Sequence, residues 1–248
     1  CGPWAWTSTQ PGVTVPPLFG AISGYEDLCA RLRDAACERV FIKARYGSSG
    51  AGVLAYARNR DGREVAYGSA ELVEQDGRWR VFNSLRQRRY DRHSDIARLV
   101  DLLAEQGAYI ERWIPKPTVP GSDGRRYDVR VVALDGQPRQ RVARMSAGAL
   151  TNLHLGNRRA DPRSLLDDTT WATVDATVRA AARVFPESAM IGFDLIPGRD
   201  RCVVLEANAF GDDVQHARCD GAEPADDQAD WVLAGLARAP ARRALAHG

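Results

Sequence analysis

Apolar residues recur at helical spacing in two stretches of the first half of the chain. Leu28, Leu32 and Ala36 are four residues apart and predict a helix over 24–38. Ser23-Gly-Tyr-Glu26 has the form of a capping box at its start. Four apolar residues with the same kind of spacing predict a second helix: Ile96, Leu99, Val100 and Leu103.

Short apolar runs between turn residues predict strands. Asp61-Gly62 and Asp135-Gly136 are hairpin turn signals. Asp161-Pro162 resembles a helix start and predicts a helix to about Phe185, and the stretch around Trp231 is also helical in pattern. Helices beside antiparallel hairpins indicate an α+β fold. The predicted strands are 40–42, 53–57, 65–68, 78–83, 108–114, 127–134, 138–145, 191–196 and 202–208.

Length and composition narrow the class of protein. The 248 residues suit one large domain or two small ones, and 44% apolar residues are enough to fill a core. With 34 basic and 32 acidic residues, the chain lacks the strongly basic balance of a nucleic-acid-binding domain. No apolar run reaches the length of a membrane-spanning helix, so no membrane association is expected.

Cysteine and proline usage give two further expectations. The five cysteines contain no C-x-x-C pair, which makes a zinc site or a disulfide framework an unfavoured interpretation and favours the cytoplasm. The chain opens with Cys1, and prolines are frequent up to Pro17. We therefore expect residues 1–20 to be a linker that follows a missing N-terminal part.

A cluster of oxygen donors is expected where two neighbouring strands pair. Glu206 and Asn208 are two residues apart, so their side chains leave the same face of one strand. Asp194 lies on the strand expected beside it. Two carboxylates and a carboxamide oxygen suit Mg²⁺ that bridges nucleotide phosphates. A solvated strand face with ordinary charges explains the same residues, and both interpretations stay open here.

A glycine-rich segment follows Lys43, which is one of only two lysines among the 34 basic residues. In Gly47-Ser-Ser-Gly50-Ala-Gly52 the glycines let backbone N–H groups approach phosphates, and the serines add hydroxyl donors. The lysine precedes the loop and the residues after it are strand-like, which differs from the Walker A and Rossmann patterns. A flexible hairpin tip is the alternative.

Two more features have the residue types of a nucleotide site. Glu111 lies in an apolar strand, where its carboxylate could accept from an adenine amino group, and Trp113 and Ile114 could cover the base. An edge strand with alternating faces is the alternative. Arg130 and Arg144 suit phosphates or the charge that develops during phosphoryl transfer, although each is a weak signal in so arginine-rich a chain.

In this order, the motifs resemble the ATP-grasp superfamily over about residues 15–213. The Asn152-Leu-His segment is similar to the branch of the ribosomal protein S6 glutamate ligases and glutathione synthetases. A bacterial ATP-grasp group of unknown substrate is similar in the combination of Asn83-Ser-Leu-Arg86, Arg88-Arg-Tyr90 and Thr151-Asn-Leu-His-Leu-Gly-Asn157. The matching segments are Phe41-Ile-Lys43 with the glycine-rich loop, Glu111-Arg-Trp-Ile114, Asp128-Val-Arg130, Thr151-Asn-Leu-His154, and the set Asp194, Glu206 and Asn208.

The resemblance implies a role for each matching residue. Asp194, Glu206 and Asn208 would bind one or two Mg²⁺ ions, or Mn²⁺ instead. The expected catalytic residues near the transferred phosphoryl group and the substrate are Arg130, Arg144 and Asn152. The expected ATP-binding residues are Lys43, Gly47, Ser48, Ser49, Gly50, Glu111, Trp113 and Ile114.

The chain departs from the family pattern in two places. The acid that holds the ATP ribose should follow Glu111 by several residues, but Lys116, Pro117 and Thr118 occupy that zone and Asp123 is only a distant substitute. The resemblance also implies an N-terminal domain before the ATP-binding part, and we expect this chain to start after that domain.

The resemblance implies a ligase that joins a carboxylate to an amine through an acyl phosphate, on a small molecule or a peptide. The alternative is a nucleotide-binding regulatory or scaffold module without turnover. A homodimer is left open. The expected division is a linker over 1–20, a small subdomain over 21–114, a large subdomain over 115–240 and a tail over 241–248.

Overall fold

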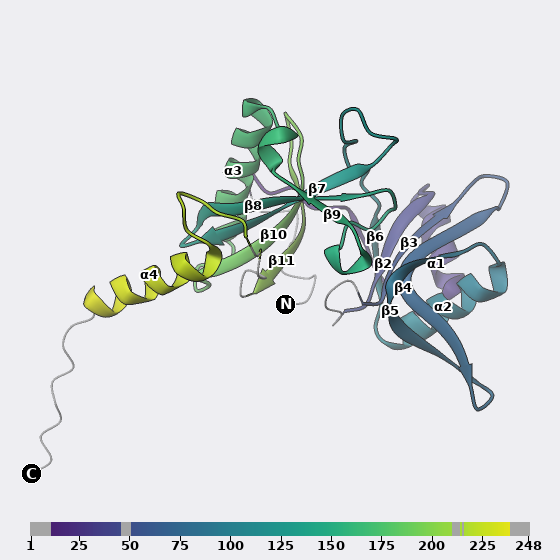
Figure 1. Cartoon of the computed structure of the whole chain (residues 1–248). Coiled ribbons are helices and arrows are strands. Elements are labelled where there is room, and N and C mark those ends of the chain that lie inside the picture. Colours follow the sequence, from purple (N-terminus) through teal and green to yellow (C-terminus); the bar gives the residue numbers. More distant parts are fainter. Residues whose placement is uncertain (1–10, 46–50, 210–213, 215, 239–248) are drawn as a thin grey trace, which may run out of the picture.

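The chain folds into two antiparallel sheets that lie side by side (Figure 1). The computed structural model describes residues 11–45, 51–209, 214 and 216–238. One sheet has six strands in the order β1-β6-β2-β3-β4-β5, and the other has five in the order β11-β10-β7-β8-β9. Helices and antiparallel strands occupy separate layers, and the predicted α+β class is confirmed.

The six-stranded sheet is covered on one face by two helices, α1 (Tyr25–Asp34) and α2 (His93–Glu105). Leu28 and Leu32 of α1 and Leu103 of α2 pack with Val40 and Ile42 of the sheet in one core. Burying an aliphatic side chain of this size contributes roughly 1.5–3 kcal/mol. The strands are β1 (Leu18–Ala21), β2 (Arg39–Lys43), β3 (Val53–Arg58), β4 (Glu64–Gln75), β5 (Arg78–Tyr90) and β6 (Tyr109–Arg112).

The five-stranded sheet is covered by α3 (Asp168–Ala182), which packs Val174 and Val178 against Val129, Val131 and neighbouring strands. Helix α4 also contacts this sheet, at its central strand β7. The strands are β7 (Arg126–Leu134), β8 (Gln137–Ser146), β9 (Arg158–Ala160), β10 (Met190–Ile196) and β11 (Val203–Ala209).

The predicted cap of one helix and the predicted start of another are wrong. Helix α1 begins after Gly24 with no side-chain cap, because the backbone N–H and the hydroxyl of Ser23 both donate to Asp27 instead of forming a capping box. Asp161-Pro162 opens only the three-residue turn η3 (Pro162–Ser164). Helix α3 starts later, where the side chain of Asp167 accepts from the N–H of Thr170 at 2.8 Å.

Sheet structure also begins earlier and extends further than the sequence predicts. Residues 18–21 form β1, which pairs with β6, inside the stretch expected to be a linker. The β4–β5 hairpin is longer than predicted and is interrupted by an irregularity between Gly68 and Ala70. Among the described residues, no helix is both long enough and apolar enough to cross a membrane.

Helix α4 (Pro224–Arg238) extends away from the rest of the molecule (Figure 1). Its first turn is attached through Asp227, which accepts from Arg139 at 2.8 and 3.0 Å and from Gln140 at 2.7 Å. Beyond this attachment its large apolar side chains are exposed, namely Trp231, Val232, Leu233 and Leu236.

Candidate functional site

Charged side chains occupy the face of the five-stranded sheet that α3 does not cover. Val129 and Val131 pack in the core under α3, so Asp128 and Arg130, which alternate with them on β7, point to the opposite face. Strand pairing extends this charged face sideways. Asp194 lies opposite Arg130 on one side and opposite Glu206 on the other.

Asp194 is held by two guanidinium groups. Arg130 donates to both of its carboxylate oxygens, at 2.6 and 2.8 Å. Arg144 lies 3.0 Å from one of the same oxygens. Because Asp194 is only 5% exposed, these bonds replace most of its hydration.

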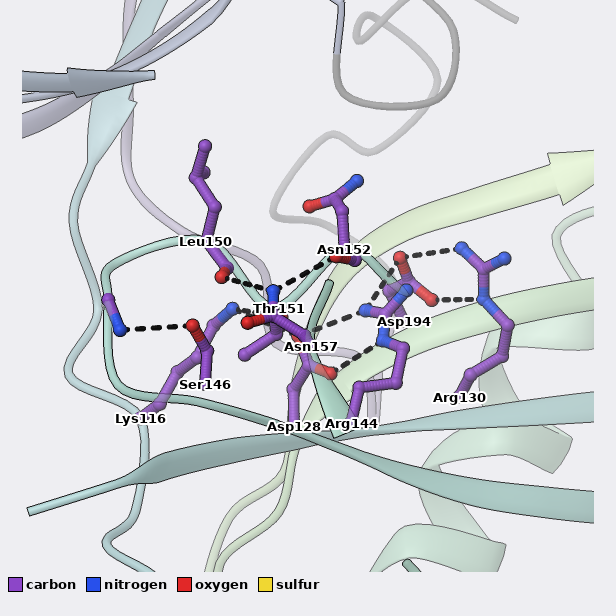
Figure 2. A network of polar contacts seen from close by, with 11 residues as sticks. Lys116, Asp128, Arg130, Arg144, Ser146, Leu150, Thr151, Asn152, Asn157 and Asp194 are labelled. Carbon is purple, nitrogen blue, oxygen red and sulfur yellow. Dashed lines mark hydrogen bonds and ion pairs between the residues drawn. The ribbon is translucent and has the colours of Figure 1, made fainter. Parts of the chain in front are cut away.

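Asp128 is the second buried carboxylate of the network (Figure 2). Arg144 donates to its two oxygens at 2.7 and 2.9 Å, and the ammonium of Lys116 lies 2.9 Å away. The hydroxyl of Thr151 donates to the same oxygen as Lys116, and Lys116 also donates to that hydroxyl at 2.6 Å. Arg144 therefore links Asp128 to Asp194, and Lys116 closes the far end of the chain of charges.

Burial and pairing shift the ionisation of this network. Burial alone would raise the pKa of Asp128 and Asp194, but attraction to Arg144, helped by Lys116 and Arg130, outweighs it and lowers both pKa values. Burial lowers the pKa of Lys116, and attraction to Asp128 offsets only part of that effect. The two carboxyls are therefore ionised under ordinary conditions.

Glu206 differs from its neighbour Asp194. Its side chain keeps an exposed surface, and no hydrogen bond to a cation is found for it among the described residues. Removal of water by the surrounding protein and repulsion from Asp194 raise the pKa of Glu206. Asn208, two residues further along β11, lies next to it, and its amide can be turned to donate to Glu206 at 3.1 Å.

Asp194, Glu206 and Asn208 suit a divalent cation by their donor chemistry. All three offer oxygen atoms, which Mg²⁺ and Mn²⁺ prefer. Loss of hydration and, after it, repulsion from Asp194 raise the pKa of Glu206, and a bound cation would oppose both effects. The residues therefore fit such an ion, with Asp194 sharing its carboxylate between the ion and the arginines.

The six-stranded sheet contributes a second charged pair on its uncovered face. Lys43 at the end of β2 forms an ion pair with Glu111 of β6, whose side chain is 9% exposed. Burial lowers the pKa of Lys43, but attraction to Glu111 outweighs it and the net shift is upward. Trp113 lies beside this pair, with its ring 5.2 Å from that of Phe41, and Ile114 is half-buried.

The charges of the two sheets act on one another. Attraction to Glu206 contributes to the raised pKa of Lys43, and Lys43 in turn opposes the rise in the pKa of Glu206. Lys43 of one sheet and Glu206 of the other therefore lie close enough for their charges to interact. The structure pairs Lys43 with Glu111 on one sheet and places Asp194 opposite Glu206 on the other.

The loop over residues 148–157 joins β8 to β9 of the five-stranded sheet and contacts both sheets. Leu150 packs against Phe41 and Ala55 of the six-stranded sheet, whereas the next residue, Thr151, is bonded into the network of the other sheet. The amide of Asn157 donates to the carbonyl oxygens of Leu150 and of Asn152, both at 2.9 Å. Asn152 starts the short turn η2 (Leu153–Leu155), and its side chain is directed away from the ion pairs in Figure 2.

Some expected site residues cannot be placed, and others were not expected. Gly47, Ser48, Ser49 and Gly50 lie outside the described residues. Asp128 and Thr151 belonged to motifs but had no assigned role. Alternation with Arg130 was the available signal for Asp128. Lys116 was singled out only by the rarity of lysine, and its partners could not be inferred.

The chain is similar to known proteins in its fold. The chain matches no protein-family model, and no curated protein matches it. It is similar in structure to D-alanine–D-alanine ligase from Bacillus anthracis solved with ATP, at 12% identity and a TM-score of 0.53, over 91% of this chain and 60% of that one. The same ligase in a second structure gives 12% identity and a TM-score of 0.50, over 89% and 58%.

Other solved ligases match less closely. The ATP-grasp ligase PsnB, solved with a minimal precursor, Mg and ADP, gives 16% identity and a TM-score of 0.48, over 92% of this chain and 55% of PsnB. The chain thus spans little more than half the length of these solved proteins. At such low identity the likeness concerns the fold, and the chain has the ATP-grasp fold.

Proposed function

We propose that the chain forms the nucleotide-binding part of an ATP- and Mg²⁺-dependent ligase that joins a carboxylate to an amine. One observation carries the proposal. In an ATP-grasp fold, Lys43 on one sheet and Glu206 on the other lie within electrostatic range of each other. A cation for phosphate and an oxygen donor set for a metal ion thus share one space.

The nucleotide would lie between the two sheets. The Lys43 ammonium would leave Glu111 and hold phosphate oxygens as a compact point charge. The freed Glu111 carboxylate would then accept from the adenine amino group, with Trp113 and Ile114 beside the base. The glycine-rich loop over 47–50 would supply further phosphate contacts.

A bound Mg²⁺ would be held by Asp194, Glu206 and Asn208, and it would neutralise phosphate charge. The residues of the chain contribute positioning and electrostatic stabilisation. Arg130 and Arg144 are fixed by the carboxylates of Asp194 and Asp128, so their remaining N–H groups are oriented before any substrate arrives.

The reaction would proceed in two displacements. A carboxylate oxygen of the substrate attacks the terminal phosphorus of ATP, the bond to ADP breaks, and an acyl phosphate forms. An amine nitrogen then attacks the acyl carbon, phosphate leaves, and the nitrogen loses a proton. Arg130 and Arg144 would stabilise the charge on the transferred phosphoryl group, and Asn152 would orient the substrate. The substrates would be a small molecule or a peptide.

The test is release of ADP and phosphate. Protein mixed with Mg-ATP should release both only when a pool of carboxylates and a pool of amines are supplied together. Replacing Asp194→Ala with Glu206→Ala should abolish Mg-nucleotide binding. A protein that binds Mg-ADP but consumes no ATP with any pool is not a ligase on its own.

The second candidate function is a nucleotide-binding regulatory module without turnover. It is favoured by Lys116, which is buried and paired with Asp128 in the zone where the ribose-binding acid was expected. This function predicts that Mg-ADP raises the melting temperature while ATP stays intact.

A further inference from the structure

We propose that Lys116 is a positioning residue that holds Thr151 and Asp128, and through them fixes the 148–157 loop and Arg144 as one rigid wall of the site. The proposal rests on the proposed function, which gives roles to Arg144 and to Asn152 of this loop. Lys116 is not assigned any contact with nucleotide or substrate.

The carboxylate of Asp128 is surrounded by donors from three residues. Its carboxylate accepts two bonds from Arg144 and one each from Lys116 and Thr151. A carboxylate offers about four acceptor positions. Three of these bonds share Oδ2 and one reaches Oδ1, and at 1% exposure the carboxylate is enclosed by its donors.

The guanidinium of Arg144 is shared between the carboxylates of Asp128 and Asp194. Lys116 neutralises part of the charge of Asp128, and Arg144 spans from Asp128 to Asp194 at 3.0 Å. Without Lys116 the uncompensated charge of Asp128 would draw Arg144 away from Asp194. The position of Arg144 between the two carboxylates therefore depends on Lys116.

The Lys116 side chain fits both of its partners. The Lys116 ammonium lies 2.6 Å from the Thr151 hydroxyl and 2.9 Å from Asp128, and its side chain is 8% exposed. Three rotatable donors on a compact head meet both acceptors at once, whereas the planar fork of arginine needs more room and a different geometry. This explains a lysine in a chain whose cations are otherwise nearly all arginine.

Thr151 links this network to the loop. Thr151 is the anchor between Leu150, which packs on the six-stranded sheet, and Asn152, whose carbonyl is tied to Asn157. A displaced Thr151 would move both neighbours. In enzymes a misplacement of about 1 Å can cost on the order of a hundredfold in rate.

The experiment compares variants at both ends of the contact. Lys116→Met and Thr151→Val each remove it, and Thr151→Ser restores the hydroxyl. Arg141→Met is the matched control. Arg141 lies on β8, as Arg144 does, but on the side of α3, where its guanidinium is 2.5 Å from Asp175 in another semi-buried ion pair. The readouts are kcat, KM for the active amine pool, the Kd of Mg-ADP, and hydrogen exchange in the 148–157 loop.

We expect Lys116→Met and Thr151→Val to lower kcat at least about tenfold, with the Kd of Mg-ADP within about twofold of wild type. Thr151→Ser should recover most of kcat, and Lys116→Arg should not. The proposal is overturned if Lys116→Met weakens Mg-ADP binding as much as it lowers kcat, which would indicate general unfolding. It is also overturned if Thr151→Val and Thr151→Ser have the same kcat.

Failure of the ligase function gives a different result. Wild-type protein would then bind Mg-ADP and never turn over, and the loop measurement alone would decide on Lys116. Faster exchange in the 148–157 loop of Lys116→Met, but not of Arg141→Met, would support the positioning role. Unchanged exchange would reject it.

Discussion

Asp194 and Glu206 lie directly opposite one another on β10 and β11, and the pKa values of their carboxyls are shifted in opposite directions. Burial raises the pKa of both groups, but only at Asp194 does attraction to arginines outweigh it. Arg144 and Arg130 both reach Asp194, whereas Glu206 faces the charge of Asp194. One carboxylate is therefore structurally satisfied, and the other keeps free capacity for a ligand.

Glu206→Gln is expected to stabilise the protein without ligand. A raised pKa means that ionised Glu206 destabilises the fold, so this cost is present above the folded pKa and disappears as falling pH protonates the group. The melting temperature at about pH 7 should rise by on the order of 2 °C. The gain over wild type should shrink toward acid pH, and the stabilisation by Mg-ADP should be lost. A lower melting temperature at neutral pH would contradict the explanation.

Lys43→Met is expected to weaken Mg-ADP binding by roughly ten- to a hundredfold. The variant loses a charge-assisted contact to phosphate, of the kind that contributes about 1.5–3 kcal/mol. Isothermal titration calorimetry measures the change. Arg60→Met provides the control, because Arg60 is a cation of the same chain with a side chain that is 94% exposed. Equal affinities for the two variants would remove Lys43 from the nucleotide site.

Asp128→Asn is expected to lower the free energy of unfolding by about 3–5 kcal/mol, because Lys116 and Arg144 would lose their shared partner in a buried place. Asp220→Asn is the control. Asp220 pairs with Arg139 through a side chain that is 79% exposed, so its loss should cost less than about 1 kcal/mol. Urea unfolding of both variants tests the difference, and similar losses would argue against a tight network.

Acid should unfold the protein partly through Asp128 and Asp194. Both have lowered pKa values, so their contribution to stability is complete above the unfolded-state pKa of about 3.9 and is lost as pH falls through the lower folded value. The free energy of unfolding should decline steeply below about pH 4. The decline should be shallower in Asp128→Asn, and a curve of unchanged slope would mean that Asp128 is not involved.

The strands near the site could be predicted from the sequence for local reasons. Asp135-Gly136 does adopt positive φ values of 48° and 73°, which a tight hairpin turn requires. The turn sets the pairing of β7 with β8 nearest to it, but an irregularity between Val131 and Ala133 shifts the register by one residue, and this shift places Asp128 opposite Arg144. Two-residue alternation then predicts which side chains share a face.

Other features depend on partners that are distant in the chain. Ser23 does not cap helix α1, because its N–H and its hydroxyl both donate to the carboxylate of Asp27. The capping-box motif takes no account of an acid at this position. The burial of Lys116 depends on Thr151, 35 residues away, and no periodicity reports such a contact. Long-range electrostatics therefore accounts for the part of the site that the pattern could not provide.

The rarity of lysine makes the protein its own chemical probe. The chain has two side-chain amines, and both lie in the networks described above, with Lys43 19% and Lys116 8% exposed at the side chain. Amine-acylating reagents would thus find hardly any side-chain targets on the outer surface. The rate at which Lys43 is modified would report whether nucleotide covers its amine. Modification of Lys116 would report opening of the buried network around Asp128.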